Sequence, residues 1–414
     1  MQTVLSKTGI EVRYPCTVHL LLNGENFECD YKSDHTGLDL LKFVCSIQKI
    51  PDYSLWGLKY MDCKSMDEQR YWLDLDKLIR SQMKNISPIR FYFRAKVYPP
   101  EPYKVQEASV RHLLFQQLRL DLMGGRLFCE VNEAAMLVAL VLQHVHSDFV
   151  PTSAWIYIMY MKSHVLRKER CSCEFYSAVQ KRALDIYQRL LAGLQRLEIE
   201  DMFLRLASKL DSYGVEPFLV RNIDKQELLL CINFHGLRAY GKNKAIFLLR
   251  WPQVSKITHE GKGLFVHFAQ GGVKVLECIS FSECAYIWSI ATDHHVYFTS
   301  PRYVSSAARE EDSPLPQDGR SDLSSFFGSC LNEYKCARFE HEMLEEQLQV
   351  SCSLLRLIDF NSWRSQLSVI YAVVILYIMG THACLFEELP FFEGLKNWVL
   401  SFMSRLVFNK VLPF

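Results

Sequence analysis

The chain has 414 residues, of which 49% are hydrophobic and 22% are charged, so it can form two to four domains with buried cores. Its 47 basic and 46 acidic residues give a net charge of +1, which excludes binding to nucleic acid through overall charge. The 14 cysteines follow no regular spacing, a pattern typical of reduced thiols and not of a disulfide framework.

The first predicted elements are two extended runs that begin at Thr17. Residues 1–15 carry early charges and have no apolar segment of secretory length, so they do not form a signal peptide. Asn23-Gly24 separates the two extended runs and predicts a tight hairpin turn. Thr36 then predicts the N-cap of a helix with one apolar face.

Three further strand-like runs complete the first predicted lobe. They begin at Gly57, Tyr71 and Ile89. The order of hairpin, helix and further strands is typical of a ubiquitin-like β-grasp fold, which we place at residues 15–98. A Pro-Pro-Glu-Pro sequence follows at residues 99–102 and must change the direction of the chain, because proline fits neither a central strand nor a helix interior.

Residues 103–213 predict a helical lobe. Apolar residues at helical spacing indicate helices near 110–120, 132–146 and 172–189 and a last helix that ends before Tyr213-Gly214. Gly124-Gly125-Arg126 follows the first of these helices. We interpret it as a helix end and not as a phosphate-binding loop, because no strand precedes it and the other glycines of a dinucleotide motif are absent.

Residues 214–299 predict a lobe of seven short strands followed by one helix over 281–296, a pattern typical of the pleckstrin-homology and phosphotyrosine-binding (PH/PTB) class. The polar residues 300–333 predict a linker with a degenerate segment at its end, and residues 334–360 predict a helix. The expected fold class is therefore α+β with several lobes.

An apolar segment near the C-terminus predicts a membrane anchor. Residues 367–386 contain no Asp, Glu, Lys or Arg, and about 20 apolar residues suffice to cross a bilayer. We predict a transmembrane helix at 366–386, with a buried core helix as the alternative. Arg356 and Arg364 precede the segment while Glu387 and Glu388 follow it, which favours a cytosolic N-terminal side. Residues 387–414 predict an amphipathic tail.

Four ordered motifs within residues 91–129 carry a family resemblance. They are Arg94-Ala95-Lys96, Tyr98-Pro99-Pro100, Gln116-Gln117-Leu118 and Gly125-Arg126-Leu127. This order resembles the junction between the first two lobes of FERM domains in the band 4.1 superfamily, and the resemblance extends over about residues 15–300. The layout is most similar to FERM-domain-containing proteins three and five, which also carry a C-terminal hydrophobic span. The resemblance implies a ubiquitin-like lobe, an acyl-CoA-binding-protein-like helical lobe and a PH/PTB-like lobe.

The resemblance also implies a peptide-binding groove in the third lobe, between one strand and the last helix. A peptide would add there as an extra strand through backbone hydrogen bonds. The expected wall residues are Ser255, Lys256, Ile257, Thr258, His259, Tyr286, Ile287, Ile290 and His294. For Ile257 and Ile287 a position in the hydrophobic core is an equal alternative.

Lys77 is the candidate contact for lipid head groups. It matches a lysine that related FERM proteins use for phosphoinositides, but their second lysine has no counterpart, because Glu283 and Cys284 stand at that position. A basic cluster formed by Lys162, His164, Arg167, Lys168 and Arg170 is either a solvated loop or a membrane-facing patch.

The sequence contains no recognisable catalytic motif, cofactor motif or metal-binding spacing. The resemblance implies a non-catalytic scaffold at the cytoplasmic face of the plasma membrane or at the cell cortex, which links membrane proteins to the submembrane cytoskeleton or to signalling. Its expected partners are cytoplasmic tails of membrane or adhesion proteins, cortical cytoskeletal proteins and phosphoinositides. The alternative is a targeting subunit that recruits a separate kinase or phosphatase to the membrane.

Overall fold

A computed structural model describes residues 2–6, 9–21, 26–61, 70–151, 156–158, 160–161, 165, 173–241, 245–301 and 303. All of them belong to the first of two units, which spans Met1–Gln349. Several predicted segments lie outside the described residues: the Asn23-Gly24 turn, the basic cluster at 162–170, nearly all of the linker, the helix at 334–360, the apolar span and the tail.

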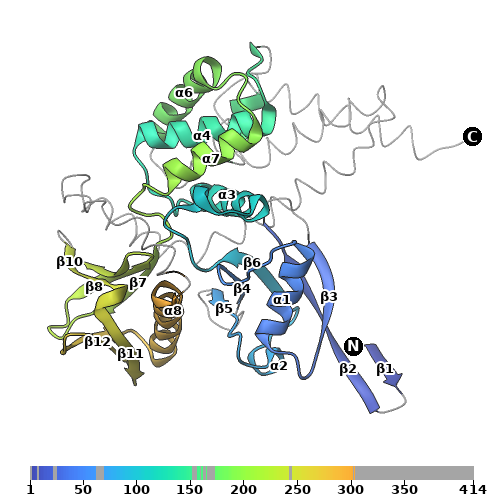
Figure 1. Ribbon diagram of the computed structural model, residues 1–414, viewed down its shortest axis with the longest axis vertical. Helices are drawn as coiled ribbons and strands as arrows, with labels where there is room; N and C mark the ends of the chain where they lie inside the picture. Colours follow the sequence, from blue (N-terminus) through green and yellow to red (C-terminus); the bar gives the residue numbers. More distant parts are fainter. Residues whose placement is uncertain are drawn as a thin grey trace, which may run out of the picture. The chain divides into compact units, whose positions relative to one another are not determined.

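The first lobe is a six-stranded sheet with one long helix (Figure 1). Its elements are β1 (Gln2–Ser6), β2 (Gly9–His19), β3 (Asn26–Lys32), α1 (Gly37–Ile47), β4 (Trp56–Met61), β5 (Arg70–Trp72), α2 (Ile79–Gln82) and β6 (Arg90–Ala95). The strand order is β1-β2-β6-β4-β5, with β3 paired to β2, and β2 runs parallel to β6. This is the β-grasp arrangement that the sequence predicts.

The N-cap of α1 is the one expected from the sequence. The Thr36 side chain accepts a hydrogen bond from the Asp39 backbone N–H at 3.3 Å, and the Asp39 carboxylate accepts one from the Thr36 N–H at 2.8 Å. This reciprocal pair satisfies two backbone donors that the helix itself cannot satisfy. The lobe also begins earlier than residue 15, because β1 pairs with the first half of β2 over Gln2↔Arg13 to Ser6↔Gly9.

The second lobe is helical and begins after the proline-rich break. Its elements are the short 3-10 helix η1 (Pro102–Lys104), α3 (Ala108–Met123), α4 (Val131–His146), α6 (Cys173–Leu190) and α7 (Arg196–Ala207). The end of α3 confirms the interpretation of the two glycines. Gly125 has a φ of 73°, the left-handed conformation that commonly ends helices, and the chain then turns so that Arg126 N–H donates to the Asp121 carbonyl at 2.7 Å.

The third lobe is a seven-stranded antiparallel sheet with one helix. Its elements are β7 (Glu216–Arg221), β8 (Glu227–Asn233), β9 (Gly236–Tyr240), β10 (Ala245–Arg250), the 3-10 helix η4 (Trp251–Gln253), β11 (Val254–Glu260), β12 (Gly263–Phe268), β13 (Val273–Cys278) and α8 (Phe281–Thr299). The strand order is β10-β9-β8-β7-β13-β12-β11, so β10 and β11 are the two edges. One hydrophobic cluster contains buried side chains from all three lobes, which therefore share a core.

Candidate functional site

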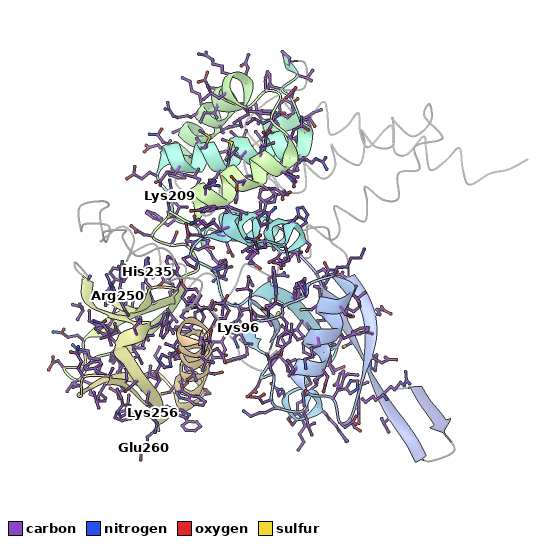
Figure 2. The ribbon with its side chains drawn as sticks, in the orientation of Figure 1. Lys96, Lys209, His235, Arg250, Lys256 and Glu260 are labelled. Atoms are coloured by element: carbon purple, nitrogen blue, oxygen red, sulfur yellow. The ribbon has the colours of Figure 1, made fainter. Side chains whose placement is uncertain are left out.

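The edge strand β11 and the helix α8 form the candidate binding surface of the third lobe. Within the sheet, β11 pairs only with β12, so its other edge faces away from the sheet. The register shifts between Val254 and Lys256, which marks an irregularity at the start of the strand. Lys256 and Glu260 are exposed on this strand (Figure 2). An edge strand of this kind offers unpaired backbone groups for a partner strand.

Two side chains of α8 attach the helix to β11. The Trp288 indole N–H donates to the Ile257 carbonyl at 2.9 Å, and His295 Nε2 donates to the Val254 carbonyl at 2.8 Å. The His259 ring also lies 5.0 Å from the Trp288 ring. The α8 side chains that reach the strand backbone are therefore Trp288 and His295, spaced seven residues apart, or about two helical turns.

The nine residues predicted for the groove occupy three different environments. Ser255 and Lys256 are exposed, and Thr258 and His259 are half-buried. Four others are buried, namely Ile257, Ile287, Ile290 and His294. Burial of His294 lowers the pKa of its imidazole. The burial of Ile257 and Ile287 agrees with the alternative interpretation, in which both residues belong to the hydrophobic core of the third lobe. The assignment of a peptide to this surface stays a prediction.

Tyr286, the ninth residue, faces the first lobe. Its ring lies 5.2 Å from the ring of Tyr71 in β5 and 6.1 Å from that of Phe218 in β7. Tyr286 is thus a contact between lobes. The sequence pattern of α8 does not show which side of the helix faces the sheet and which faces the first lobe, because every side carries aromatic or aliphatic residues.

Lys77 lies at the surface of the first lobe. Its side chain is 69% exposed and forms an ion pair with Asp74 at 2.8 Å. At the position of the missing second lysine, Cys284 is fully buried in the first turn of α8. The role of Lys77 in lipid binding stays a prediction.

A charged cluster connects all three lobes around Glu216 at the start of β7. The carboxylate contacts Lys59 of β4 at 3.2 Å and Arg126, after α3, at 3.3 Å. Only 17% of the Glu216 side chain is exposed. Burial alone would raise the pKa of Glu216, but the charges of Lys59 and Arg126 lower it to about 2. Lys96 and Asp293 form a second ion pair between the first and third lobes.

Tyr98 continues this connection into the second lobe. Its hydroxyl donates to the Asp121 carboxylate at 2.6 Å, and the Gln117 side chain accepts from the Ala95 N–H at 3.1 Å. All four FERM-like motifs between residues 91 and 129 therefore supply contacts between lobes, through Lys96, Tyr98, Gln117 and Arg126. The sequence identified these motifs but not the atoms that they join.

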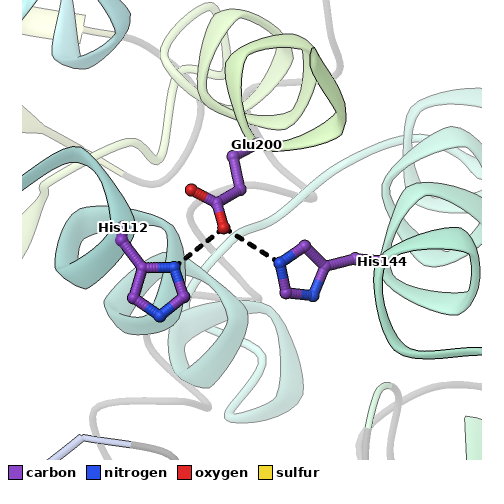
Figure 3. Close-up of side chains that lie close together, drawn as sticks. All are labelled: His112, His144 and Glu200. Atoms are coloured by element: carbon purple, nitrogen blue, oxygen red, sulfur yellow. Dashed lines mark hydrogen bonds and ion pairs between the residues drawn. The ribbon is translucent and has the colours of Figure 1, made fainter. Parts of the chain in front are cut away.

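One cluster of potential metal ligands occurs in the described part of the chain, in the helical lobe. Glu200 Oε1 accepts from His112 Nδ1 at 2.8 Å and from His144 Nε2 at 2.9 Å (Figure 3). Burial alone would raise the pKa of Glu200, but the two histidine hydrogen bonds lower it to about 2. No sequence pattern indicates this cluster, because its members are 32 and 56 positions apart.

Among the described residues, no helix combines the length and the apolar character that crossing a membrane requires. The span predicted at 366–386 lies outside those residues.

Three family models match successive parts of the chain. Residues 19–85 match the FERM N-terminal domain, residues 100–218 the FERM central domain and residues 222–306 the FERM C-terminal PH-like domain. Together they cover more than half of the chain, and they follow the three lobes of the fold in order.

Curated proteins of similar sequence are band 4.1 proteins. The chain is 26% identical to Band 4.1-like protein 3 of Homo sapiens over 285 residues. This match covers 67% of this chain and 25% of that protein. It is also 26% identical to Protein 4.1 of Homo sapiens over 284 residues. This match covers 67% of this chain and 32% of that protein. The chain thus matches about a quarter to a third of the length of these relatives.

Solved structures share the fold. The FERM and C-terminal domain complex of Drosophila Merlin has a TM-score of 0.60 at 18% identity and covers 70% of this chain and 99% of that chain. The MyTH4-FERM MF2 domain of Dictyostelium discoideum myosin VII has a TM-score of 0.53 at 11% identity and covers 69% of this chain and 58% of that chain. At these identities the similarity establishes the three-lobed FERM fold alone.

Proposed function

The chain belongs to the FERM-domain proteins of the band 4.1 superfamily, and from that premise we propose that it is a non-catalytic scaffold. In this role the three lobes bind cytoplasmic tails of membrane proteins and connect them to the cytoskeleton beneath the membrane. The observation that carries the proposal is the edge strand β11, which lies beside α8 with exposed Ser255 and Lys256.

An extended tail peptide would add to β11 as a further strand. Backbone hydrogen bonds would supply affinity, and side chains on alternate positions would supply selectivity. The carbonyls of Val254 and Ile257 already accept hydrogen bonds from α8. The peptide would therefore pair beyond these bonds, along the part of β11 that follows Ile257 and ends at Glu260, with the exposed side chain of Lys256 next to it.

Reversing the charge of Lys256 tests this surface. We expect Lys256→Glu to weaken capture of the tail peptides that the unmodified chain selects from an array of juxtamembrane sequences by at least about tenfold. This is the effect of losing one of the few interface residues that each contribute about 2 kcal/mol or more, and about 1.4 kcal/mol is a factor of ten. The matched control is Lys209→Glu, an exposed lysine of the helical lobe (Figure 2), which should leave capture unchanged. Equal capture by both variants would exclude β11 as the tail-binding edge.

This lysine is a better probe than a core substitution such as Ile257→Asp. Only 7% of Ile257 is exposed, so an aspartate there would place an unpaired charge in the core of the third lobe and unfold it. Recovery of a stoichiometric kinase or phosphatase with the intact chain, instead of membrane-protein tails, would favour the targeting-subunit alternative.

The proposal also includes membrane attachment through residues 366–386, which contain no Asp, Glu, Lys or Arg and are long enough to cross a bilayer as a helix. We expect the 414-residue chain to stay in the membrane pellet after alkaline carbonate extraction and a chain without residues 365–414 to be released. Deletion of residues 388–414 alone is the control, and it should leave the protein in the pellet. Release of the intact chain would exclude a transmembrane anchor.

A further inference from the structure

Three side chains from three helices converge on one point in the helical lobe. His112 comes from α3, His144 from α4 and Glu200 from α7, and their ligand atoms all lie within 4.8 Å of one another (Figure 3). We propose that this cluster binds a Zn²⁺ ion. Two imidazoles and one carboxylate form a donor set that zinc uses in proteins, with a fourth position open to water or another ligand.

The geometry of the cluster is close to what the ion requires. Both histidines point at the same carboxylate oxygen, Oε1 of Glu200, with N···O distances of 2.8 and 2.9 Å. Ligand atoms around one tetrahedral Zn²⁺ lie about 3.3 Å apart, because Zn–N and Zn–O bonds are about 2.0–2.2 Å long. To admit the ion, each N···O contact must lengthen by about half an ångström, and the two histidine nitrogens, which lie within 4.8 Å of each other, must take up a separation of about 3.3 Å as well.

The more exposed ligand can make this shift. The side chain of His112 is 42% exposed, whereas those of His144 and Glu200 are 11% and 8% exposed. His112 can thus rotate against solvent, whereas the 2.9 Å contact between His144 and Glu200 must lengthen inside the lobe. Glu200 also lines a pocket of about 360 Å³ together with Arg111 and Asp201.

The protons balance without a further reactant. A carboxylate only accepts hydrogen bonds, so His112 Nδ1 and His144 Nε2 carry the protons that point at Glu200. When both rings are neutral, zinc takes these two nitrogens and each ring keeps its one proton on its other nitrogen. A ring that is initially protonated releases one proton to solvent.

The neighbour of one ring, that of His112, is compatible with this change, while Nδ1 of His144 is without a partner before and after it in the described part of the chain. His112 Nε2 lies 2.7 Å from the Gln116 amide nitrogen, and rotation of the amide would present its oxygen to accept the relocated proton, as outer-shell partners of zinc-bound histidines do. The buried Nδ1 of His144 has no hydrogen-bond partner among the described residues. The ion-free cluster is therefore not a saturated hydrogen-bond network.

Zinc titration of the intact 414-residue chain tests the site. After removal of metal with EDTA, we expect competition with a fluorescent zinc chelator to reveal one bound equivalent that depends on the three ligands. His112→Gln should weaken this binding by at least about tenfold, since it removes one of three protein ligands. Glu200→Gln should abolish it. The rise in unfolding temperature that zinc produces should therefore be smaller in His112→Gln and absent in Glu200→Gln.

The matched control is His35→Gln, which changes a half-buried histidine of the first lobe and should leave zinc affinity unchanged. If Glu200→Gln does not fold, His112→Gln decides the question, because its side chain is partly in solvent. Replacement of zinc by Co²⁺ gives an independent readout, with visible absorption bands expected for the unmodified chain and their loss in His112→Gln. Equal zinc affinity of His112→Gln and the unmodified chain, or no binding at micromolar zinc, would overturn the proposal.

Discussion

Replacing Glu216 with alanine should lower the free energy of unfolding of the protein by about 3–5 kcal/mol, because the change leaves partly buried cations without their counter-charge. Lys59 and Arg126 are only 13% and 24% exposed, and Lys59 also lies over the Trp72 ring at 4.5 Å. Neither side chain can reach bulk water without giving up packing. Urea unfolding followed by tryptophan fluorescence measures the loss.

The matched control for Glu216 is Glu277→Gln. Glu277 pairs with Lys225, whose side chain is 70% exposed, and a surface ion pair of this kind contributes at most about 1 kcal/mol. A loss of similar size in both variants would show that the Glu216 cluster does not hold the lobes together.

The stability of the protein should also fall in acid because of Glu216. A carboxyl whose pKa is about 2 in the folded protein and about 4.3 in the unfolded chain stabilises the fold fully above pH 4.3. This contribution is lost as the pH falls through that range towards 2, and it amounts to as much as about 3 kcal/mol. Glu216→Gln should therefore flatten the dependence of unfolding free energy on pH between about 4.3 and 2 relative to the unmodified chain.

Replacing Gly236 with alanine should cost more than about 3 kcal/mol, since two separate penalties apply. Gly236 begins β9 with a φ of +139°, which side chains rarely adopt, and an added Cβ would lie 2.0 Å from the Leu249 carbonyl oxygen. That oxygen belongs to the paired strand β10, so the strands must separate. Thermal unfolding of the variant measures the effect.

Gly193→Ala separates the two penalties at Gly236. Gly193 has a φ of +80° with nothing within 4 Å of an added Cβ, so only the conformational penalty of about 1–2 kcal/mol applies. Equal losses of stability in the two variants would mean that β9 and β10 separate without an energetic penalty, so that the steric contact at Gly236 adds nothing.

The sequence predicted most of the fold because the local signals are strong. The cap at Thr36, the glycines after α3 and the apolar spacing of the helices act within a few residues, so they can be read from one segment. One strand was not anticipated. Among the described strands, β1 pairs only with the first half of β2, which itself begins before the first extended run that the sequence predicts.

The candidate sites were harder to predict because they depend on distant residues. Glu216 lies 157 positions from Lys59, and a charged residue at the start of a strand usually indicates a solvated end. The same limit applies to His112, His144 and Glu200. On α8, the choice between the face with Ile287 and Ile290 and the face with Trp288 and His295 depends on where the sheet lies, which the helix sequence alone does not encode.

The cluster around Glu216 has a consequence for how such lobes can be cut or recombined. A fragment with only the third lobe would carry Glu216 without either cation, and a fragment with the first two would carry Lys59 and Arg126 without their anion. Each excised piece would therefore lose charge balance at a buried surface. The three lobes should therefore be exchangeable only as one unit. We expect a chimaera with a single lobe from a homologue to fold only when the homologue has matching charges at the positions of Lys59, Arg126 and Glu216.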